Sequence, residues 1–383
     1  MFWERRIRMR EVYISDKLYE YFSALLRRGK SCFFPNGSTS FHISDVKRLG
    51  GSNEVYSFFL TYRGKDFQHR INLILKIYIK ALEPVLKNYA NCTSFSRLSY
   101  SYPQLYCGQI ERCEKEFQVL RGLERVNFPV PKVYVHELDS NIFGYPFTIM
   151  QKEELNQNKS NYLESSINNL VRLHNLDLTM LGIDCLKSPE DSYAFARRCL
   201  LFFKLLLNLS SRHSKELTRD FDFAIRWLES NVSIARSPKY CLVHGDYHIY
   251  ANAILTNDSR MFVMDWEDAE IGDPAFDVGY AFARMWVDFD EKTADRVVQE
   301  YMRHFDGDIA ERLRFYKLVV FLGEAILHSS VVSNPLTTYD IHGITAFLTF
   351  PFLRLPFNAK RTGANTDIIW LDCFKEFFEE YLR

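Results

Sequence analysis

The stretch YCLVHGDYHIYANAILTNDSRMFVMDWEDAEIGDPAFDVGYAFARMW, residues 240–286, decides the fold. It begins with an apolar run, 240–243, that predicts a short buried strand, and at His244 it breaks into a polar loop. Two further apolar runs, 253–255 and 261–264, are separated by turn residues and predict two more strands. Catalytic groups are commonly carried by loops at the ends of strands. The pattern therefore predicts a site to which three strands deliver polar side chains.

Two carboxylates stand at the ends of these strands, with an amide between them in the sequence. Asp246 follows the first strand, Asn252 precedes the second, and Asp265 follows the third. One carboxylate can act as a base, while a carboxylate and an amide oxygen are ligands that suit a hard cation such as Mg²⁺. The arrangement is typical of a phosphoryl-transfer loop.

The motifs of this stretch resemble those of the aminoglycoside phosphotransferase and choline kinase-like family, whose members have a protein-kinase-like fold. The resemblance rests on three blocks at family-like spacing: His244-Gly245-Asp246 with Asn252, then Asp265-Trp266-Glu267, then Gly272-Asp273-Pro274 with Asp277. A lone His-Gly-Asp occurs by chance in many chains, whereas the three blocks together are specific. The resemblance covers about 41–330 and is strongest over 242–280.

The resemblance implies an α+β, two-lobed fold, with a small lobe built on a mainly antiparallel sheet and one main helix. It divides the chain into an N-terminal extension, 1–40, a nucleotide-binding lobe, 41–152, and a helical lobe, 153–383, that carries the catalytic and acceptor site. A chain of 383 residues exceeds the size at which single cores usually split, which agrees with two lobes.

The resemblance also gives roles to residues of the central stretch. Asp246 is expected to accept the proton of an acceptor hydroxyl as that hydroxyl attacks the γ-phosphate of ATP or GTP. Asp265 and Asn252 are expected to bind Mg²⁺. His244 is expected to support the loop by hydrogen bonding, and Asp277 to tie the following segment to it.

One spacing departs from the family pattern. The family usually places its aspartate and asparagine five positions apart, whereas Asp246 and Asn252 are six apart and Ala251 occupies the expected place. Either a one-residue bulge lets Asn252 reach the site, or a metal ligand is missing and activity is weak or lost. We favour the bulge because Asp246, Asp265 and Lys76 are all retained.

The small lobe holds residues expected to bind the nucleotide. Gly50, Gly51 and Ser52 lie between two β-rich runs and predict a hairpin turn, in which glycine N–H groups can approach phosphate oxygens. Lys76 lies in the strand-like run 72–78. The resemblance makes Lys76 the lysine that holds the α and β phosphates.

The expected partner of Lys76 is Glu116. It lies near the start of a segment in which Leu120 and Leu123 give a helical apolar stripe. Without the downstream motifs, a solvated helix face would be the simpler interpretation of Glu116. With them, we predict an ion pair between Lys76 and Glu116.

Two apolar runs, 128–133 and 145–150, are expected to be the strands that lead to the hinge between the lobes. The backbone from Met150 to Lys152 is then expected to present donors and acceptors to the purine. Because recognition would use the backbone, the side chains do not distinguish ATP from GTP.

Several other segments predict helices, a loop and an insertion. Residues 15–28 have helical spacing, with Ser15 and Asp16 as the N-cap. Gly29 is followed by Lys-Ser as in a P-loop, but the first glycine of that motif is absent, so a helix-terminating loop is predicted. The segment 81–109 is longer than a simple connection and predicts an inserted loop. Further helices are predicted over 168–176, 194–207, 221–228, 293–305 and 310–327.

Composition and charge limit the possible partners. Lys plus Arg equals Asp plus Glu at 48 each, so no bulk charge favours nucleic acid or an anionic membrane. The eight cysteines are scattered without a Cys-x-x-Cys pair, which favours reduced thiols in a cytoplasmic protein. Neither a secretory signal nor a transmembrane helix is expected. The expected partners are a nucleotide and a small molecule with a hydroxyl group.

The acceptor and some rival functions stay open. Asp288, Asp290 and Glu291 near Trp286 either receive a cationic amine, aided by cation–π contact, or form a solvated helix end. Aminoglycosides, sugars and amino alcohols are all compatible. A nucleotide-binding pseudokinase and a protein kinase are the rival functions. A metal-dependent phosphohydrolase built around His248 is disfavoured, because the other histidines show no matching spacing. The oligomeric state is not specified.

Overall fold

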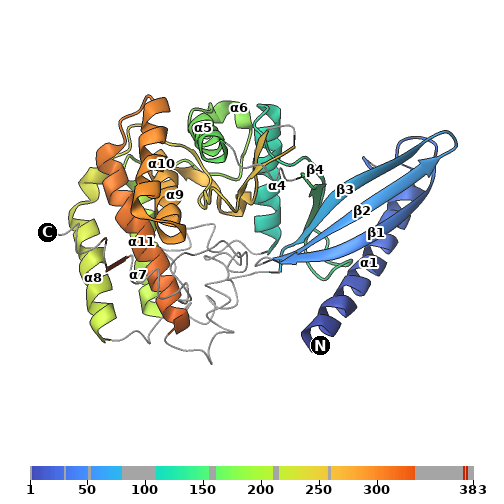
Figure 1. The fold of residues 1–383 in the computed structure, drawn as a ribbon, viewed down its shortest axis with the longest axis horizontal. Helices are drawn as coiled ribbons and strands as arrows, with labels where there is room; N and C mark the ends of the chain where they lie inside the picture. Colours follow the sequence, from blue (N-terminus) through green and yellow to red (C-terminus); the bar gives the residue numbers. More distant parts are fainter. Residues whose placement is uncertain are drawn as a thin grey trace.

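The computed structural model describes residues 2–29, 32–50, 53–79, 109–154, 161–209, 215–257 and 260–332, together with 374, 375 and 377. Figure 1 shows long strands and one long helix at the N-terminal side of the molecule and a cluster of helices at the other side. Helix α4 stands between the two parts (Figure 1). The α+β class and the two-lobed, kinase-like arrangement predicted from the sequence are therefore confirmed.

A five-stranded sheet forms the small lobe. Its strands are β1 Ser38–Gly50, β2 Glu54–Gly64, β3 Gln68–Ile77, β4 Val133–Glu137 and β5 Phe147–Gln151. They follow the order β1-β2-β3-β5-β4, and every neighbouring pair is antiparallel. The predicted hairpin is confirmed, because β1 ends at Gly50 and β2 begins four residues later. Gly51 and Ser52 lie outside the described residues.

Helix α1, Phe2–Arg28, packs along β1 and completes the core of the small lobe. Ile14, Leu18 and Phe22 recur at a spacing of four on one face of this helix, and all three are fully buried. They belong to the same apolar cluster as Phe58 of β2. The segment predicted as an extension is thus packed into the small lobe, while the predicted boundaries at 40/41 and 152/153 stay predictions.

The predicted start of this helix is wrong. Ser15 and Asp16 lie inside α1, which begins at Phe2. The upstream half is held against the sheet, since the guanidinium of Arg10 pairs with the carboxylate of Glu54 at 2.7 Å. The end is as predicted, because Gly29 adopts a left-handed conformation, with φ of 64°, and terminates the helix.

Helix α4, Gln109–Arg125, joins the lobes. Val119, Leu120 and Leu123 of α4 are buried in the apolar cluster of the large lobe. The insertion predicted over 81–109 lies outside the described residues except for Gln109, which begins α4. The strand predicted over 128–133 is displaced, since β4 begins only at Val133.

The large lobe is mainly helical, and all five helices predicted there are present with bounds that differ by a few residues. Its helices are α5 Tyr162–His174, α6 Leu178–Leu181, α7 Ala194–Leu209, α8 Lys215–Ser230, α9 Pro274–Asp288, α10 Glu291–His304 and α11 Ala310–Val332, with the 3-10 turns η2 Val232–Ala235 and η3 Trp266–Asp268. Helix α9 is buried over most of its length and packs against α10 and α11. It is the central helix of this lobe.

Two short antiparallel ribbons carry the central stretch of the sequence. Strand β6, Cys241–Val243, pairs with β9, Glu270–Gly272, and β7, Ala253–Leu255, pairs with β8, Met261–Val263. Strand β9 was not predicted, because its sequence, Glu-Ile-Gly, contains no apolar run. The ribbons place the polar loop after β6 beside the segment after β8.

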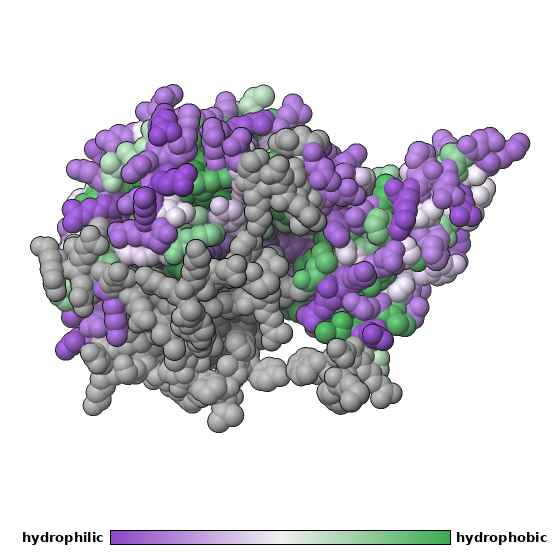
Figure 2. All heavy atoms as spheres, in the orientation of Figure 1, coloured by the Kyte–Doolittle hydropathy of each residue, from purple (hydrophilic) through white to green (hydrophobic). Residues whose placement is uncertain are grey.

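Hydrophilic residues dominate the described surface in Figure 2. Among the described side chains of α1, Met9 and Val12 are the most exposed apolar ones, at 63% and 62%. Within the described residues, no helix combines the length and the apolar character needed to cross a bilayer.

Candidate active site

The catalytic loop, residues 244–252, is anchored to the first turn of α9. The buried carboxylate of Asp277 accepts hydrogen bonds from the backbone N–H groups of His244, at 2.7 Å, and Gly245, at 3.0 Å. The imidazole of His174 approaches the same carboxylate at 3.1 Å. The predicted tie from Asp277 is therefore present, and it holds the backbone just ahead of the expected base.

The first residues of the loop are fixed by close packing. Gly245 has φ of 85°, and a Cβ atom there would lie 2.4 Å from the carbonyl oxygen of Asp268, so only glycine fits without strain. His244 donates from Nε2 to the carbonyl of Met264 at 2.8 Å, and its Nδ1 accepts the N–H of Asp246 at 3.2 Å. Burial lowers the pKa of His244, which keeps the ring neutral. These contacts are the supporting contacts predicted for it.

Asp246 is buried in the loop with one oxygen engaged and one free. Its Oδ2 accepts a hydrogen bond from the amide of Asn252, while its Oδ1 has no hydrogen-bond partner among the described residues. Burial raises the pKa of Asp246 well above its usual value, and the positive charge of Arg284 opposes this shift. A carboxylate with a raised pKa and a free oxygen is suited to accept a proton.

Asn252 reaches Asp246 in spite of the six-residue spacing. Its amide nitrogen donates to the carbonyl oxygen of Asp246 at 2.9 Å as well as to the carboxylate. The backbone N–H groups of Ala251 and Asn252 both donate to the carbonyl of His248, at 3.1 and 2.8 Å. This turn absorbs the extra residue, which confirms the predicted bulge. Because the nitrogen is engaged, the amide oxygen is the atom of Asn252 that a metal would bind.

The β7–β8 ribbon brings Asp265 to the same place. Ala253 pairs with Val263, and just beyond that pair the carbonyl of Asn252 accepts the N–H of Met264 at 2.8 Å. Asp265 follows in a left-handed conformation, with φ of 64°, that a non-glycine residue rarely adopts. Its carboxylate is 22% exposed. Carboxylate and amide oxygens are the ligands that Mg²⁺ prefers, so the pair fits that ion.

Lys76 of β3 lies among three carboxylates. Its Nζ is 2.7 Å from Glu116, 2.7 Å from Asp265 and 3.3 Å from Glu267. The predicted ion pair with Glu116 is thus present. Burial acts to lower the pKa of Lys76, but the carboxylates of Asp265, Glu116 and Glu267 outweigh it and raise that pKa well above its ordinary value. The ammonium group is therefore permanently charged.

Three residues to which the sequence analysis gave no role contact this group of side chains. Glu267 pairs through Oε1 with Arg112 of α4 at 2.9 Å, and through Oε2 it accepts from the amide of Asn53 at 2.7 Å. Asn53 follows the predicted glycine turn, so Glu267 links that turn to the segment after β8. We call Lys76, Arg112, Glu116, Asp265 and Glu267 the charge cluster. The only sequence signal was the Asp-Trp-Glu block, which gave Glu267 no role.

The strand that leads to the predicted hinge is β5, which ends at Gln151. Met150 lies inside β5 and pairs with β3 and β4. The N–H groups of Gln151 and Lys152 donate to the carbonyls of Lys132, at 2.8 Å, and Asn72, at 3.0 Å. These two N–H groups are therefore engaged within the sheet, while the expected contact of the Met150–Lys152 backbone with a purine stays a prediction.

The acidic residues near Trp286 lie at helix ends: Asp288 is the last residue of α9, and Asp290 and Glu291 begin α10. Trp286 is 3% exposed and packs edge-on against Phe282 and Phe321 in the core. Asp290 caps α10 by accepting the N–H of Thr293 at 2.7 Å. Trp286 is thus not available for a cation–π contact with an acceptor.

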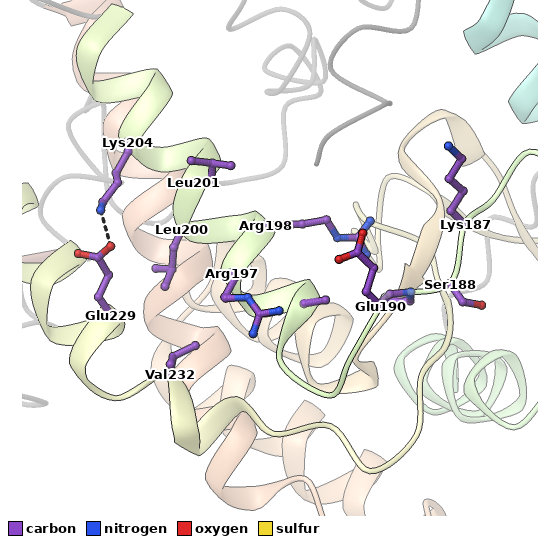
Figure 3. A pocket seen from close by; sticks show the side chains of 12 residues that line it. Lys187, Ser188, Glu190, Arg197, Arg198, Leu200, Leu201, Lys204, Glu229 and Val232 are labelled. Atoms are coloured by element: carbon purple, nitrogen blue, oxygen red, sulfur yellow. Dashed lines mark hydrogen bonds and ion pairs between the residues drawn. The ribbon is translucent and has the colours of Figure 1, made fainter. Parts of the chain in front are cut away.

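A pocket of about 590 Å³ lies beside α7 (Figure 3). Its lining includes Arg197, Arg198 and Lys204 of α7 and Val232 of η2. Several of its basic side chains are already ion-paired: Lys204 with Glu229, which Figure 3 marks with a dashed line, and Arg198 with Glu270 of β9 at 3.4 Å. These pairs compensate the positive charges of Lys204 and Arg198.

A two-lobed fold with a buried lysine–glutamate pair in one lobe and an aspartate-bearing loop in the other defines a phosphotransferase of the protein-kinase-like fold. The comparisons with known proteins agree. The chain belongs to the phosphotransferase enzyme family, whose model matches residues 45–316. The members of this family are enzymes that transfer phosphoryl groups.

Solved structures share the fold at low sequence identity. A putative aminoglycoside phosphotransferase from Ralstonia eutropha has a TM-score of 0.56 and 16% identity, over 94% of this chain and 98% of that chain. An ethanolamine kinase from Plasmodium vivax has a TM-score of 0.50 and 13% identity, over 89% and 84%. A thermostable mutant of an aminoglycoside phosphotransferase, in complex with ADP and hygromycin B, has a TM-score of 0.50 and 14% identity, over 80% and 95%. These likenesses show the fold alone.

Curated relatives are longer proteins. A probable acyl-CoA dehydrogenase from Arabidopsis thaliana is 27% identical over 184 residues, which is 44% of this chain and 22% of that protein. Acyl-CoA dehydrogenase family member 10 from Mus musculus is 27% identical over 182 residues, which is 44% of this chain and 16% of that protein. The chain thus matches less than a quarter of the length of these relatives.

Proposed function

We propose that the protein transfers the γ-phosphoryl group of a magnesium nucleotide, ATP or GTP, to the hydroxyl of a small molecule such as an aminoglycoside, a sugar or an amino alcohol. The observation that carries the proposal is the Oδ1 atom of Asp246, which is buried and has no hydrogen-bond partner among the described residues. A buried polar atom without a partner calls for an explanation. An acceptor hydroxyl would supply the missing partner.

Asp246 then acts as the general base. Its Oδ1 accepts the proton of the hydroxyl as the acceptor oxygen forms a bond to the γ-phosphorus. The bond from that phosphorus to the β–γ bridging oxygen breaks, and the nucleoside diphosphate leaves with the electron pair. The hydrogen bond from Asn252 to Oδ2 orients the carboxylate so that Oδ1 faces the acceptor.

The phosphates are held from the other side of the site. Asp265 and the amide oxygen of Asn252 would hold Mg²⁺, which neutralises charge on the phosphates when bound. The ammonium of Lys76, kept in place by Glu116, supplies a fixed positive charge to the α and β phosphates. The solved complex of an aminoglycoside phosphotransferase with ADP supports a nucleotide as co-substrate.

The test is release of nucleoside diphosphate with Mg²⁺ and either ATP or GTP across a panel of sugars, amino alcohols, aminoglycosides, macrolides and homoserine. Asp246→Asn removes the base and keeps the shape, and we expect it to lower kcat by roughly a hundred- to ten-thousand-fold. The matched control is Asp177→Asn, an exposed N-cap of α6 where asparagine caps equally well.

Acceptor-dependent release that is lost in Asp246→Asn and kept in Asp177→Asn would support the proposal and name the acceptor class. Equal release by Asp246→Asn and the unchanged protein would contradict Asp246 as the base. Nucleotide binding without turnover of any acceptor would favour the pseudokinase alternative.

A further inference from the structure

His248 is a partly buried residue of the catalytic loop, and both its ring and its backbone make hydrogen bonds within that loop. Its Nδ1 accepts the N–H of Ala251 at 3.0 Å, and its carbonyl accepts the N–H groups of both Ala251 and Asn252. Because Nδ1 is an acceptor, the ring proton lies on Nε2. That nitrogen lies 2.9 Å from the carboxylate of Asp288, the last residue of α9.

These contacts lie where the loop differs from the family pattern. The turn from His248 to Asn252 contains the additional residue between Asp246 and Asn252, and both N–H groups that close the turn bond to His248. The ring adds a third hydrogen bond, to the residue immediately before Asn252. Its other end is fixed to α9, which also holds the start of the loop through Asp277.

The rest of the loop is anchored independently of His248. Tyr247 and Ile249 on either side of it are each 1% exposed. Tyr250 stacks on Tyr162 of α5, with ring centroids 5.1 Å apart. Loss of the His248 ring would therefore loosen the turn locally, while these side chains keep the loop in its place.

We propose that His248, braced by Asp288, is a positioning residue that closes the lengthened turn and so holds Asn252 against Asp246. The inference rests on the proposed function, in which Asn252 binds the metal. It requires that the pair His248 and Asp288 affects the metal through Asn252 and leaves the binding of the nucleotide itself unchanged.

The experiment measures Mn²⁺ affinity of the protein–ADP complex by electron paramagnetic resonance, together with ADP affinity in the absence of metal. His248→Leu removes both ring contacts, and Asp288→Ala removes the brace. We expect each to weaken Mn²⁺ binding by about tenfold or more, the usual effect of losing a group that orients a metal ligand. His248→Asn can still accept from the Ala251 N–H, so it is expected to retain more Mn²⁺ affinity than His248→Leu.

The matched control is His304→Leu. His304 is an exposed histidine that also contacts a carboxylate, that of Glu300, at 3.0 Å, but it lies at the end of α10. It is expected to leave Mn²⁺ affinity unchanged. Hydrogen exchange gives a readout without metal: the amides of Ala251 and Asn252 are expected to exchange faster in His248→Leu, while those of β6 do not.

The proposal is overturned if His248→Leu binds Mn²⁺ within twofold of the unchanged protein, or if metal-free ADP affinity falls by the same factor as Mn²⁺ affinity. Equal Mn²⁺ affinity in His248→Asn and His248→Leu would also overturn the role of the ring acceptor. None of these measurements needs turnover. A protein that fails to phosphorylate any acceptor but shows the expected Mn²⁺ pattern would lose the proposed function and keep this inference.

Discussion

The charge cluster and the catalytic loop are both buried, but different interactions hold them. The charge cluster joins three parts of the chain, with Lys76 from β3, two residues from α4 and two from the segment after β8, and it is held by direct ion pairs. The catalytic loop belongs to the large lobe, and the carboxylate of Asp277 holds the backbone N–H groups of His244 and Gly245 at its start. Balance of charge keeps one region in place, and satisfied hydrogen bonds keep the other.

The difference has a physical consequence for the two regions. Removing one member of a buried ion-pair network leaves an uncompensated charge, which costs more than the pair contributed. Removing one acceptor of buried N–H groups leaves neutral donors unsatisfied, which costs less. The charge cluster is therefore expected to be the more sensitive region to single substitutions, and the catalytic loop the more sensitive to the position of α9.

The largest effect is expected for Lys76→Met. This variant leaves Glu116 and Glu267 facing each other with the cation between them removed. We expect the free energy of unfolding at pH 7 to fall by about 3–5 kcal/mol, with part of the loss recovered at lower pH as a carboxyl group protonates. Chemical denaturation measures this, and nucleotide binding should be lost in parallel.

The control for this prediction is Lys17→Met. Lys17 pairs with Glu20 at the same distance, 2.7 Å, but on the surface of α1, where such pairs contribute little. Its stability should not change measurably. If both lysine variants lose the same stability, burial does not set the sensitivity of the charge cluster.

The sequence predicted local features well, and it predicted poorly the contacts between residues that lie far apart along the chain. The ion pair of Lys76 and Glu116 was predicted from the family resemblance, and it is present. Glu267 binds Asn53 across 214 positions, and no local pattern reports such a contact. The hydrogen bond from the Lys152 N–H to Asn72 was likewise not predicted, because strand ends are decided by pairing with another strand and not by composition.

The catalytic loop shows the same limit. A bulge between Asp246 and Asn252 was predicted from the six-residue spacing together with the retention of Asp246, Asp265 and Lys76. The means of forming it, a turn closed on His248, depends on Asp288 at the far end of α9 and could not be read from spacing. The start of α1 was missed for a similar reason, since Arg10 is held by a residue of β2.

The next largest effect is expected for Asp277→Asn. Asparagine offers one acceptor oxygen where the carboxylate offers two, and its amide N–H₂ faces a backbone donor, so one buried N–H of His244 or Gly245 loses its partner. We expect a loss of about 1–3 kcal/mol in the free energy of unfolding. The kcat should also fall, because the displaced backbone leads directly to Asp246. Denaturation and the diphosphate-release assay test both, and unchanged values would remove Asp277 as the anchor.

A pH effect is expected from His244. Its pKa is lowered by burial in the folded protein, so the unfolded chain binds a proton more readily. The stability that the neutral ring contributes is fully present above the ordinary pKa of about 6.5 and is lost as the pH falls below it. The slope should reach about 1.4 kcal/mol per pH unit at most.

His244→Gln should flatten this part of the stability profile between about pH 6.5 and 5, measured by denaturation at a series of pH values. A slope that survives in His244→Gln would assign the pH dependence to another group.

The smallest effect is expected for Asp290→Ala, which isolates burial from hydrogen bonding. Asp290 and Asp277 each accept a backbone N–H at 2.7 Å, but Asp290 is exposed and caps α10 whereas Asp277 is fully buried. Water can replace the lost carboxylate at an exposed cap, so the loss of stability should be smaller than in Asp277→Asn. Because Asp290 binds its own helix, KM for cationic acceptors should not change. A raised KM for amines alone would instead indicate that Asp290 contacts the acceptor. A loss of stability equal to that of Asp277→Asn would show that the hydrogen bond itself, and not its burial, sets the stabilising contribution of Asp277.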